Sequence, residues 1–317
     1  MATTAVPMFA EPNDQTTGPG ELAYSASLMG RALILAGVSA DQAYLHAARI
    51  GAELEANDGA REPRRDLFTV ARTIAGAEKA RRAISQLEGV AALQSIDLPI
   101  VVLLGGTTGT GKSTIATEVA HRLAITRVSS TDFIRQTLRA VFAKGFMSTI
   151  HYSSFDAGLA VTEETGFDRV LAGFVEQSRH VCVGVEAAVT RAVAERWSMV
   201  LEGVHLVPGL YPATLDGAIV VPAVVQVPDP ELHRRCFHER SVATGGLRPK
   251  RKYLDRFDEI RRIQSHIVAR AARHSVTVVE NTDLHEAIDQ IIDLVLAAAK
   301  QSRSQVERDA QRAQIQP

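Results

Sequence analysis

Cysteine is nearly absent from this chain of 317 residues, and its two cysteines, Cys182 and Cys236, lie far apart in the sequence. Neither belongs to a Cys-x-x-Cys pair, so the sequence offers neither a disulfide framework nor a cysteine-based zinc site. Such scarcity is typical of proteins that work in a reducing compartment, and we therefore expect a cytoplasmic protein.

Long apolar runs and a strong net charge are missing as well. The longest apolar run, residues 218–225, contains Pro222 and is too short to span a bilayer, so we expect no membrane association. Residues 1–14 show no basic region followed by an apolar core, which predicts no signal peptide. The formal net charge of −1 excludes a generally basic nucleic-acid-binding surface, although not a local basic patch.

The most informative stretch that is present is a glycine-rich run at residues 106–113, which matches the pattern G-x-x-x-x-G-K-[ST]. An apolar, strand-like run at 100–104 precedes it, and a helix-forming segment at 114–120 follows. Glycines let backbone N–H groups converge on phosphate oxygens, and the helix N-terminus adds further donors. The predicted nucleotide-binding residues are Gly106, Thr107, Thr108, Gly109, Thr110, Gly111, Lys112, Ser113 and Thr114. We expect ATP as the ligand, with Lys112 on its β- and γ-phosphates and Ser113 on Mg²⁺.

The rest of the chain predicts two kinds of domain. Residues 1–20 are expected to be a flexible arm, 21–94 a small helical domain with helices near 28–36, 40–54 and 67–87, and 301–317 a flexible tail. Within 95–300, strands at 100–104, 126–128, 198–201, 219–227 and 276–279 alternate with helices at 133–143, 179–195, 231–240, 256–274 and 284–299. This alternation predicts an α/β P-loop kinase-like domain with a parallel sheet flanked by helices.

Two carboxylates follow predicted strands, where ligands of open parallel sheets bind. Asp132 lies just past the second strand and is a candidate for managing an acceptor hydroxyl, with Arg135 one turn further on. The alternative is that Asp132 only caps the helix that begins at Phe133. Glu202 ends the third strand, where a carboxylate would contact Mg²⁺ through water, and the alternative is a surface glutamate. His205 is expected to be packed rather than catalytic.

A basic segment separates the fourth and fifth strands. Between residues 231 and 262, ten Lys/Arg minus five Asp/Glu leave a local net charge of +5. Glycines at 245 and 246 and Pro249 interrupt it, which is typical of a hinged lid that closes over phosphates. A solvated helical face with salt bridges is the alternative, and sparse aromatic residues argue against nucleic-acid binding.

Several stretches beyond the P-loop resemble one family, the 2-phosphoglycerate kinases, over about residues 20–295. They are 130–132 with Arg135, His-Tyr-Ser-Ser-Phe at 151–155, Leu-Glu-Gly-Val-His-Leu-Val-Pro-Gly at 201–209, and Glu-Asn at 280–281. The resemblance also makes residues 32–54 look like the family's ATP-cone-like module. It implies ATP- and Mg²⁺-dependent phosphorylation of the 3-hydroxyl of 2-phosphoglycerate to 2,3-bisphosphoglycerate.

The same resemblance assigns roles to individual residues. It implies catalytic roles for Lys112, Asp132 and Glu202, metal contacts from Ser113 and Glu202, and a nucleotide contact from Asn281. The implied substrate-binding residues are Arg135, His151, Ser153, Ser154, Arg240 and Arg248. Two alternatives stay open: a kinase for another small phosphorylated acid, sugar or nucleoside, and a nucleotide-sensing interaction protein. The sequence carries no signal for oligomeric state.

Overall fold

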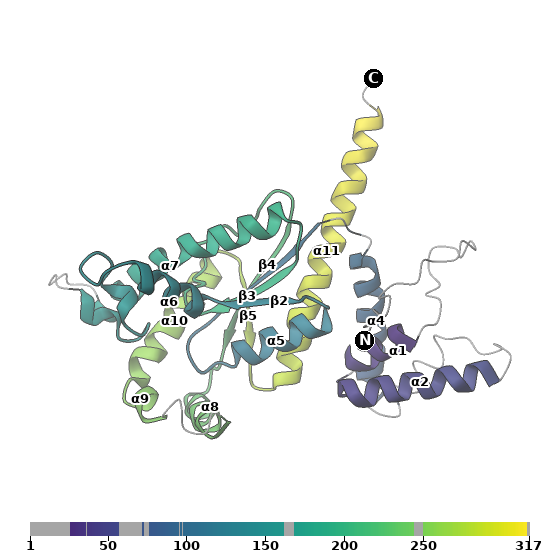
Figure 1. Ribbon diagram of the computed structural model, residues 1–317, viewed down its shortest axis with the longest axis horizontal. Helices are drawn as coiled ribbons and strands as arrows, with labels where there is room; N and C mark the ends of the chain where they lie inside the picture. The colour runs from purple at the N-terminus through teal and green to yellow at the C-terminus, as the bar shows by residue number, and fades with distance from the viewer. Residues whose placement is uncertain are drawn as a thin grey trace, which may run out of the picture. The chain divides into compact units, whose positions relative to one another are not determined.

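A computed structural model of the protein describes residues 26–35, 37–56, 72, 76–94, 96, 98–161, 168–243 and 250–315 (Figure 1). The chain forms two compact units, Met1–Ile84 and Ser85–Pro317. The arm predicted at 1–20 lies outside the described residues. The division between the units falls inside a helix, α4 (Ala77–Gln94), and the predicted boundary at residue 94 stays a prediction.

The first unit is helical where it is described. Helix α1 (Ala26–Leu35) packs against α2 (Ala40–Ala56), and Leu33 and Ala43 are fully buried. Gly37, with φ of 88°, ends α1: its N–H donates to the Ile34 carbonyl, while Val38 N–H donates to the Leu33 carbonyl. This pair of bonds is a Schellman C-cap, which needs the left-handed backbone that glycine adopts at little cost. Of the helix predicted at 67–87, residues 67–71 and 73–75 lie outside the described residues.

The second unit is built on a five-stranded sheet. Its strands are β1 (Ile100–Gly105), β2 (Arg127–Ser130), β3 (Met199–Gly203), β4 (Ile219–Gln226) and β5 (Thr277–Glu280). They lie in the order β2-β3-β1-β4-β5, and every neighbouring pair is parallel. All five predicted strands are therefore confirmed, together with the parallel α/β class. The sheet order places β3 directly beside β1, the strand that leads into the P-loop.

Alternating side chains of the buried strands serve the two faces of the sheet. Val101 and Leu103 of β1 pack with Leu201 of β3 against α7 (Arg169–Ala194), while α6 (Thr131–Val141) also covers this face. On the other face, α5 (Lys112–Arg122) contacts β1 and β3, and α11 (Leu284–Ile315) contacts α5 and β4 (Figure 1). The sheet is thus covered on both faces, as parallel sheets require.

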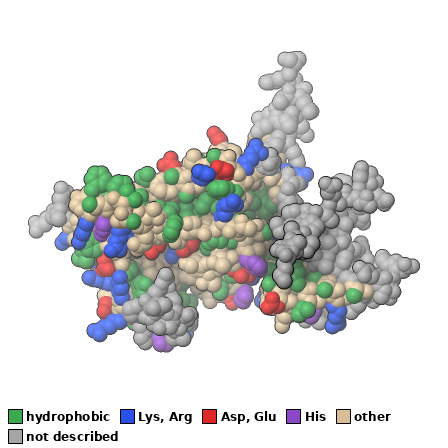
Figure 2. All heavy atoms as spheres, in the orientation of Figure 1, with side chains coloured by type: hydrophobic (Ala, Val, Ile, Leu, Met, Phe, Trp, Pro, Cys, Tyr) green, Lys and Arg blue, Asp and Glu red, His purple; other side chains and the backbone are tan. Residues whose placement is uncertain are grey.

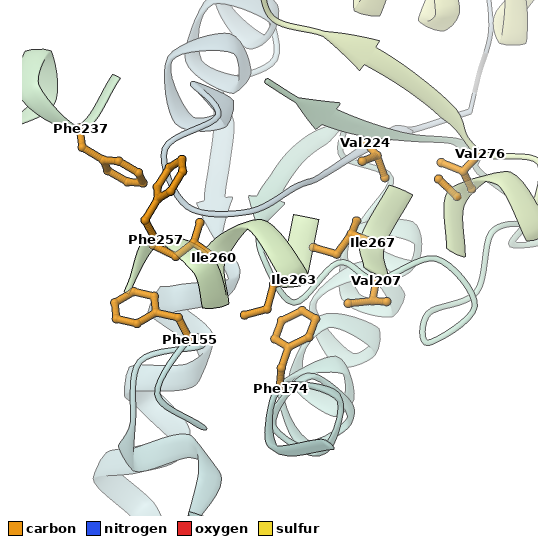
Figure 3. Packing of buried hydrophobic residues seen from close by; sticks show 11 residues of the cluster. Phe155, Phe174, Val207, Val224, Phe237, Phe257, Ile260, Ile263, Ile267 and Val276 are labelled. Carbon is orange, nitrogen blue, oxygen red and sulfur yellow. The ribbon is translucent and has the colours of Figure 1, made fainter. Parts of the chain in front are cut away.

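A second hydrophobic cluster joins the sheet to α10 (Phe257–Arg273). Figure 3 shows Phe174 of α7 facing Ile263 of α10, with Phe237 and Phe257 at one end of the cluster. Phe237 belongs to α8 (Pro230–Ala243) and stacks on Tyr253 of the short helix α9 (Lys250–Leu254) at 5.2 Å between ring centroids. Full burial of one such side chain stabilises a fold by about 1.5–3 kcal/mol. Both helices that flank residues 244–249 are therefore anchored to the core.

Two helix boundaries of the second unit differ from the prediction by ten residues or more. Helix α7 begins at Arg169 rather than near 179, because Asp168 caps it by accepting from the N–H groups of Val170 and Leu171. Residues 301–315, predicted as a tail, continue α11 as helix to Ile315; the stretch has neither glycine nor proline and is rich in helix formers. Among the described residues, none of the helices is both long enough and apolar enough to cross a membrane.

Candidate active site

The P-loop occupies the carboxyl end of β1, as its sequence predicted. Its glycines at 106, 109 and 111 have φ of 137°, 88° and 81°, a backbone region that other residues rarely adopt. A Cβ atom at Gly106 would overlap the Val225 carbonyl oxygen, and one at Gly109 would lie 2.6 Å from the Phe237 ring. Gly111 then starts α5 as its N-cap. The conformation and the close packing together demand glycine at these positions.

Lys112, the first residue of α5, has a buried side chain that returns over the loop. Its Nζ donates to the Thr107 carbonyl at 2.8 Å, and the hydroxyl of Thr110 donates to the same carbonyl at 3.0 Å. Burial lowers the pKa of Lys112, while the carboxylates of Glu202 and Asp132 act in the opposite direction. The ammonium group therefore lies in the loop with two negative charges near it.

Ser113 and Glu202 meet at the loop although 89 residues separate them. In the sheet, Glu202 lies between Leu104 of β1 and Ser130 of β2, and it accepts a hydrogen bond from the Ser113 hydroxyl through Oε1 at 3.0 Å. Only 9% of Glu202 is exposed, so the alternative of a surface glutamate is wrong. A hydroxyl and a carboxylate are oxygen ligands that suit Mg²⁺, which also keeps waters and substrate phosphates in its shell.

Asp132 is not the cap of α6. The cap is Ser130, whose Oγ accepts from the N–H of Phe133 at 3.2 Å, so the cap-only interpretation of Asp132 is wrong. Asp132 instead stands in the first turn with a side chain that is 65% exposed. Arg135 holds its Oδ1 through Nε at 2.9 Å and Nη2 at 2.8 Å. The carboxylate is thus oriented by Arg135 and remains open to a ligand.

The remaining donors of Arg135 limit its own predicted role as a substrate-binding group. Its Nη1 donates to the carbonyls of Ile150 and Tyr152, at 2.8 and 3.1 Å. Together with the two bonds to Asp132, these use four of the five guanidinium N–H groups, which leaves at most one for a ligand. The buried side chain of Arg135 connects α6 with the 3-10 helix η1 (Thr149–His151), and its main effect is to orient the carboxylate of Asp132.

His205 is packed, as expected, and ties this region together. Its Nδ1 bonds with the Thr131 hydroxyl at 2.8 Å and its Nε2 with Gln177 Oε1 at 3.0 Å. Gln177 Nε2 donates to the Thr149 and Tyr152 carbonyls, so its Oε1 faces His205, and Nε2 of His205 must carry the hydrogen. The pKa of His205 is lowered to about 3, mainly because the ring is buried, and the ring is therefore neutral. Sequence reasoning missed Gln177, because nothing in the helical pattern of α7 distinguishes it.

The other predicted substrate residues fall into three groups. His151 Nε2 donates to the Phe142 carbonyl at 3.0 Å, and Ser154 is nearly buried. Ser153 accepts from Nζ of Lys252 on α9 at 3.1 Å, so the segment after η1 and the basic region do meet. Arg240 lies on α8 with its side chain outside the described part, and Arg248 lies outside the described residues altogether.

The basic segment serves the fold as well as any ligand. Arg256 pairs with Asp156 at 3.1 Å and Glu259 at 3.0 Å, and Arg261 donates to the carbonyls of Val227 and Pro228. On α9, by contrast, the side chain of Arg251 is 91% exposed, and its Nε lies 3.7 Å from Oδ2 of Asp255. Figure 2 shows blue side chains gathered over α9 and the adjoining edge of the domain. The salt-bridge interpretation therefore holds for part of the segment, and Arg251 of α9 presents an accessible cation.

Asn281 and His233 complete the surroundings of the loop. Asn281, just after β5, donates from Nδ2 to the Thr110 carbonyl at 3.0 Å. His233 of α8 bonds through Nε2 with the Thr108 carbonyl at 2.8 Å. Asn281 was predicted as a nucleotide-binding residue, while His233 was missed. The sequence gives little indication of this role for His233, which lies one helical turn before Phe237 in a polar helix.

Three curated relatives of this chain carry one name. A 2-phosphoglycerate kinase of Methanopyrus kandleri is 36% identical over 285 residues, covering 87% of this chain and 84% of the relative. Those of Methanothermobacter thermautotrophicus and Thermococcus kodakarensis are 34% and 35% identical, covering 85% and 86% of this chain and 89% and 92% of the relatives. A shikimate kinase from Acinetobacter baumannii in complex with shikimate aligns with 65% of this chain and 97% of its own, at 13% identity and a TM-score of 0.37. No family model matches the chain.

Proposed function

This chain belongs to the 2-phosphoglycerate kinase family, and from that membership we propose that it transfers the γ-phosphoryl group of ATP to 2-phosphoglycerate. The observation that carries the proposal is the meeting of Lys112, Ser113 and Glu202 at the P-loop, beside the open carboxylate of Asp132. In the reaction, the 3-hydroxyl oxygen forms a bond to the γ-phosphorus. The bond between the γ-phosphorus and the oxygen that bridges the β- and γ-phosphates breaks. The products are 2,3-bisphosphoglycerate and ADP.

The residues at the loop suit the triphosphate. Backbone N–H groups of residues 106–113 would bind the phosphate oxygens, and the Lys112 ammonium would neutralise the charge that develops during transfer. Ser113 and Glu202 would hold Mg²⁺, because their oxygens lie 3.0 Å apart and the carboxylate is shielded from bulk water. When bound, Mg²⁺ would neutralise charge on the β- and γ-phosphate oxygens.

Asp132 is the residue we assign to the acceptor. Its carboxylate interacts electrostatically with the Lys112 ammonium, is oriented by Arg135 and is exposed. It can therefore accept the proton that leaves the 3-hydroxyl. The acceptor carries a phosphate and a carboxylate and therefore needs several cations and donors. Lys252 and Ser153, which bond to each other, would supply part of that set, with His151, Ser154, Arg240 and Arg248 as further candidates.

Two broader assignments follow the same proposal. The cytoplasm is the proposed location, since two cysteines outside any Cys-x-x-Cys pair are typical of proteins in a reducing compartment. The proposed partners are small molecules rather than nucleic acids or membranes. The helical first unit remains, as predicted, a candidate ATP-cone-like module.

An acceptor panel tests the proposed function. The full chain is incubated with Mg²⁺ and ATP plus 2-phosphoglycerate, 3-phosphoglycerate, glycerate, shikimate or a nucleoside, and ADP release is followed with product identification by mass spectrometry. We expect turnover with 2-phosphoglycerate and a bisphosphorylated product. Turnover with another acceptor alone would reassign the substrate. Hydrolysis without transfer to any acceptor would favour a nucleotide-sensing protein instead.

A further inference from the structure

Side chains from outside the P-loop bond to its backbone carbonyls at two places. His233 of α8 bonds with the Thr108 carbonyl through Nε2 at 2.8 Å, and Asn281 after β5 donates to the Thr110 carbonyl at 3.0 Å. A carbonyl oxygen can only accept, so in both cases the side chain is the donor. These two bonds reach the loop from elements that lie 125 and 171 residues away in the chain.

Each bond fixes the orientation of a whole peptide plane. In a planar trans peptide, the C=O group and the following N–H group point in opposite directions. A Thr108 carbonyl held toward His233 therefore turns the N–H of Gly109 the other way, and a Thr110 carbonyl held toward Asn281 does the same for Gly111. Both glycines have positive φ, and glycine crosses between backbone regions at low cost, so these two planes are the ones most in need of an external restraint.

Both donors are themselves held in place. His233 is fully buried, stacks on Phe237 at 5.2 Å and meets Phe257 edge-on at 5.5 Å. Burial lowers its pKa to about 4, so the ring is neutral and its one hydrogen is on Nε2. Among the described residues, its Nδ1 is a buried atom with no hydrogen-bond partner. Asn281 is anchored by its own N–H, which donates to the Gln226 carbonyl at 2.8 Å.

We propose that His233 and Asn281 are positioning residues that lock the peptide planes before Gly109 and Gly111, so that both glycine N–H groups face the triphosphate. The inference rests on the proposed function only in taking ATP as the ligand. It gives Asn281 a role through the loop rather than through a direct nucleotide contact. It also makes α8, the helix that leads into residues 244–249, part of the phosphate-binding structure.

The test measures binding of a non-hydrolysable ATP analogue with Mg²⁺ by calorimetry, with no acceptor present. His233→Gln keeps an N–H donor near the position of Nε2, whereas His233→Leu removes it. Asn281→Asp keeps the shape of the side chain and replaces the donor by an acceptor. We expect His233→Leu and Asn281→Asp to weaken analogue binding by about tenfold to a hundredfold, and His233→Gln to stay within about threefold of the wild type. In kinetics, KM for ATP should rise while KM for the acceptor stays constant.

His266→Leu is the matched control. His266 of α10 meets Phe174 edge-on at 6.3 Å, and its Nε2 is also a buried atom without a hydrogen-bond partner among the described residues. It has no bond to the loop in the described structure, so this change should alter stability and leave analogue affinity unchanged. If His233→Leu and Asn281→Asp bind the analogue as tightly as His266→Leu does, the proposal is wrong.

A measurement on the unaltered protein covers the case in which the variants fail to fold. The amide resonances of Gly109 and Gly111 are followed by NMR during titration with the analogue and Mg²⁺. Large shifts of both support the proposal, and unchanged resonances for both, while Lys112 responds, would overturn it. An unreactive wild type that still binds the analogue would refute the proposed acceptor and leave the peptide-plane inference standing.

Discussion

Replacing Glu202 by Gln tests the centre of the proposed site with a minimal change. Glutamine has nearly the same shape, and its side-chain oxygen can still accept from Ser113 Oγ, which now lies 3.0 Å from Glu202 Oε1. The fold should therefore survive. What disappears is one negative charge, buried in the sheet between β1 and β2 and next to the Lys112 ammonium.

Two effects follow from the lost charge. Removing one preorganised electrostatic group from a transfer site typically costs about 10²–10³ in kcat, and a neutral amide oxygen is also a weaker ligand for Mg²⁺. Burial already lowers the pKa of Lys112, and Glu202 is the foremost group opposing that shift, so the pKa falls further in the variant. Because Lys112 works as a cation, its contribution is lost as pH rises through its pKa. The alkaline limb of the pH profile should then move to lower pH.

The assay is ADP release with 2-phosphoglycerate over a series of Mg²⁺ concentrations and pH values. Glu195→Gln serves as the control, because Glu195 follows α7, is exposed and pairs with Arg191 at 2.9 Å on the same helix. That variant should match the wild type. A Glu202→Gln enzyme with kcat within about threefold of the wild type at every Mg²⁺ concentration, and an unmoved alkaline limb, would refute the assigned role.

Three further predictions concern single residues. Lys112→Ala should abolish turnover with the circular dichroism spectrum unchanged; retained activity would place the site elsewhere. In Gly111→Ala and Gly217→Ala the backbone holds an alanine at positive φ, which costs about 1–2 kcal/mol of stability in each variant. Only at Gly111 would the new Cβ also displace Asn281. Only Gly111→Ala should therefore lose ATP binding in a calorimetric titration. His205→Leu should lower the free energy of unfolding at pH 7 by about 1–3 kcal/mol for each orphaned partner. Since the folded chain excludes the proton that unfolded His205 takes up, wild-type stability should fall as pH drops from about 6.5 toward 3, and urea titrations should show a flatter pH dependence in the variant.

Local features of this chain follow from its sequence with little ambiguity. The apolar run at 100–104, the glycines of the P-loop and the helix after them occupy consecutive residues, so their conformations are set by neighbours in the sequence. Helix ends are harder to predict. Asp168 begins α7 and Ser130 caps α6 through bonds for which several nearby polar residues compete, and the pattern alone left Asp132 open as the cap.

The sequence by itself determined the strand, loop and helix that bind phosphate, the α/β alternation, and the few carboxylates that could serve a transfer reaction. Only the tertiary structure decided how those groups are used. The order of the sheet brings Glu202 to Ser113, the carbonyls of Ile150 and Tyr152 accept from Nη1 of Arg135, and α8 carries His233 to the Thr108 carbonyl. The physical reason is that periodicity and backbone preference act over a few residues. Pairing between distant segments and the loss of water around a side chain depend instead on how all the buried faces pack together.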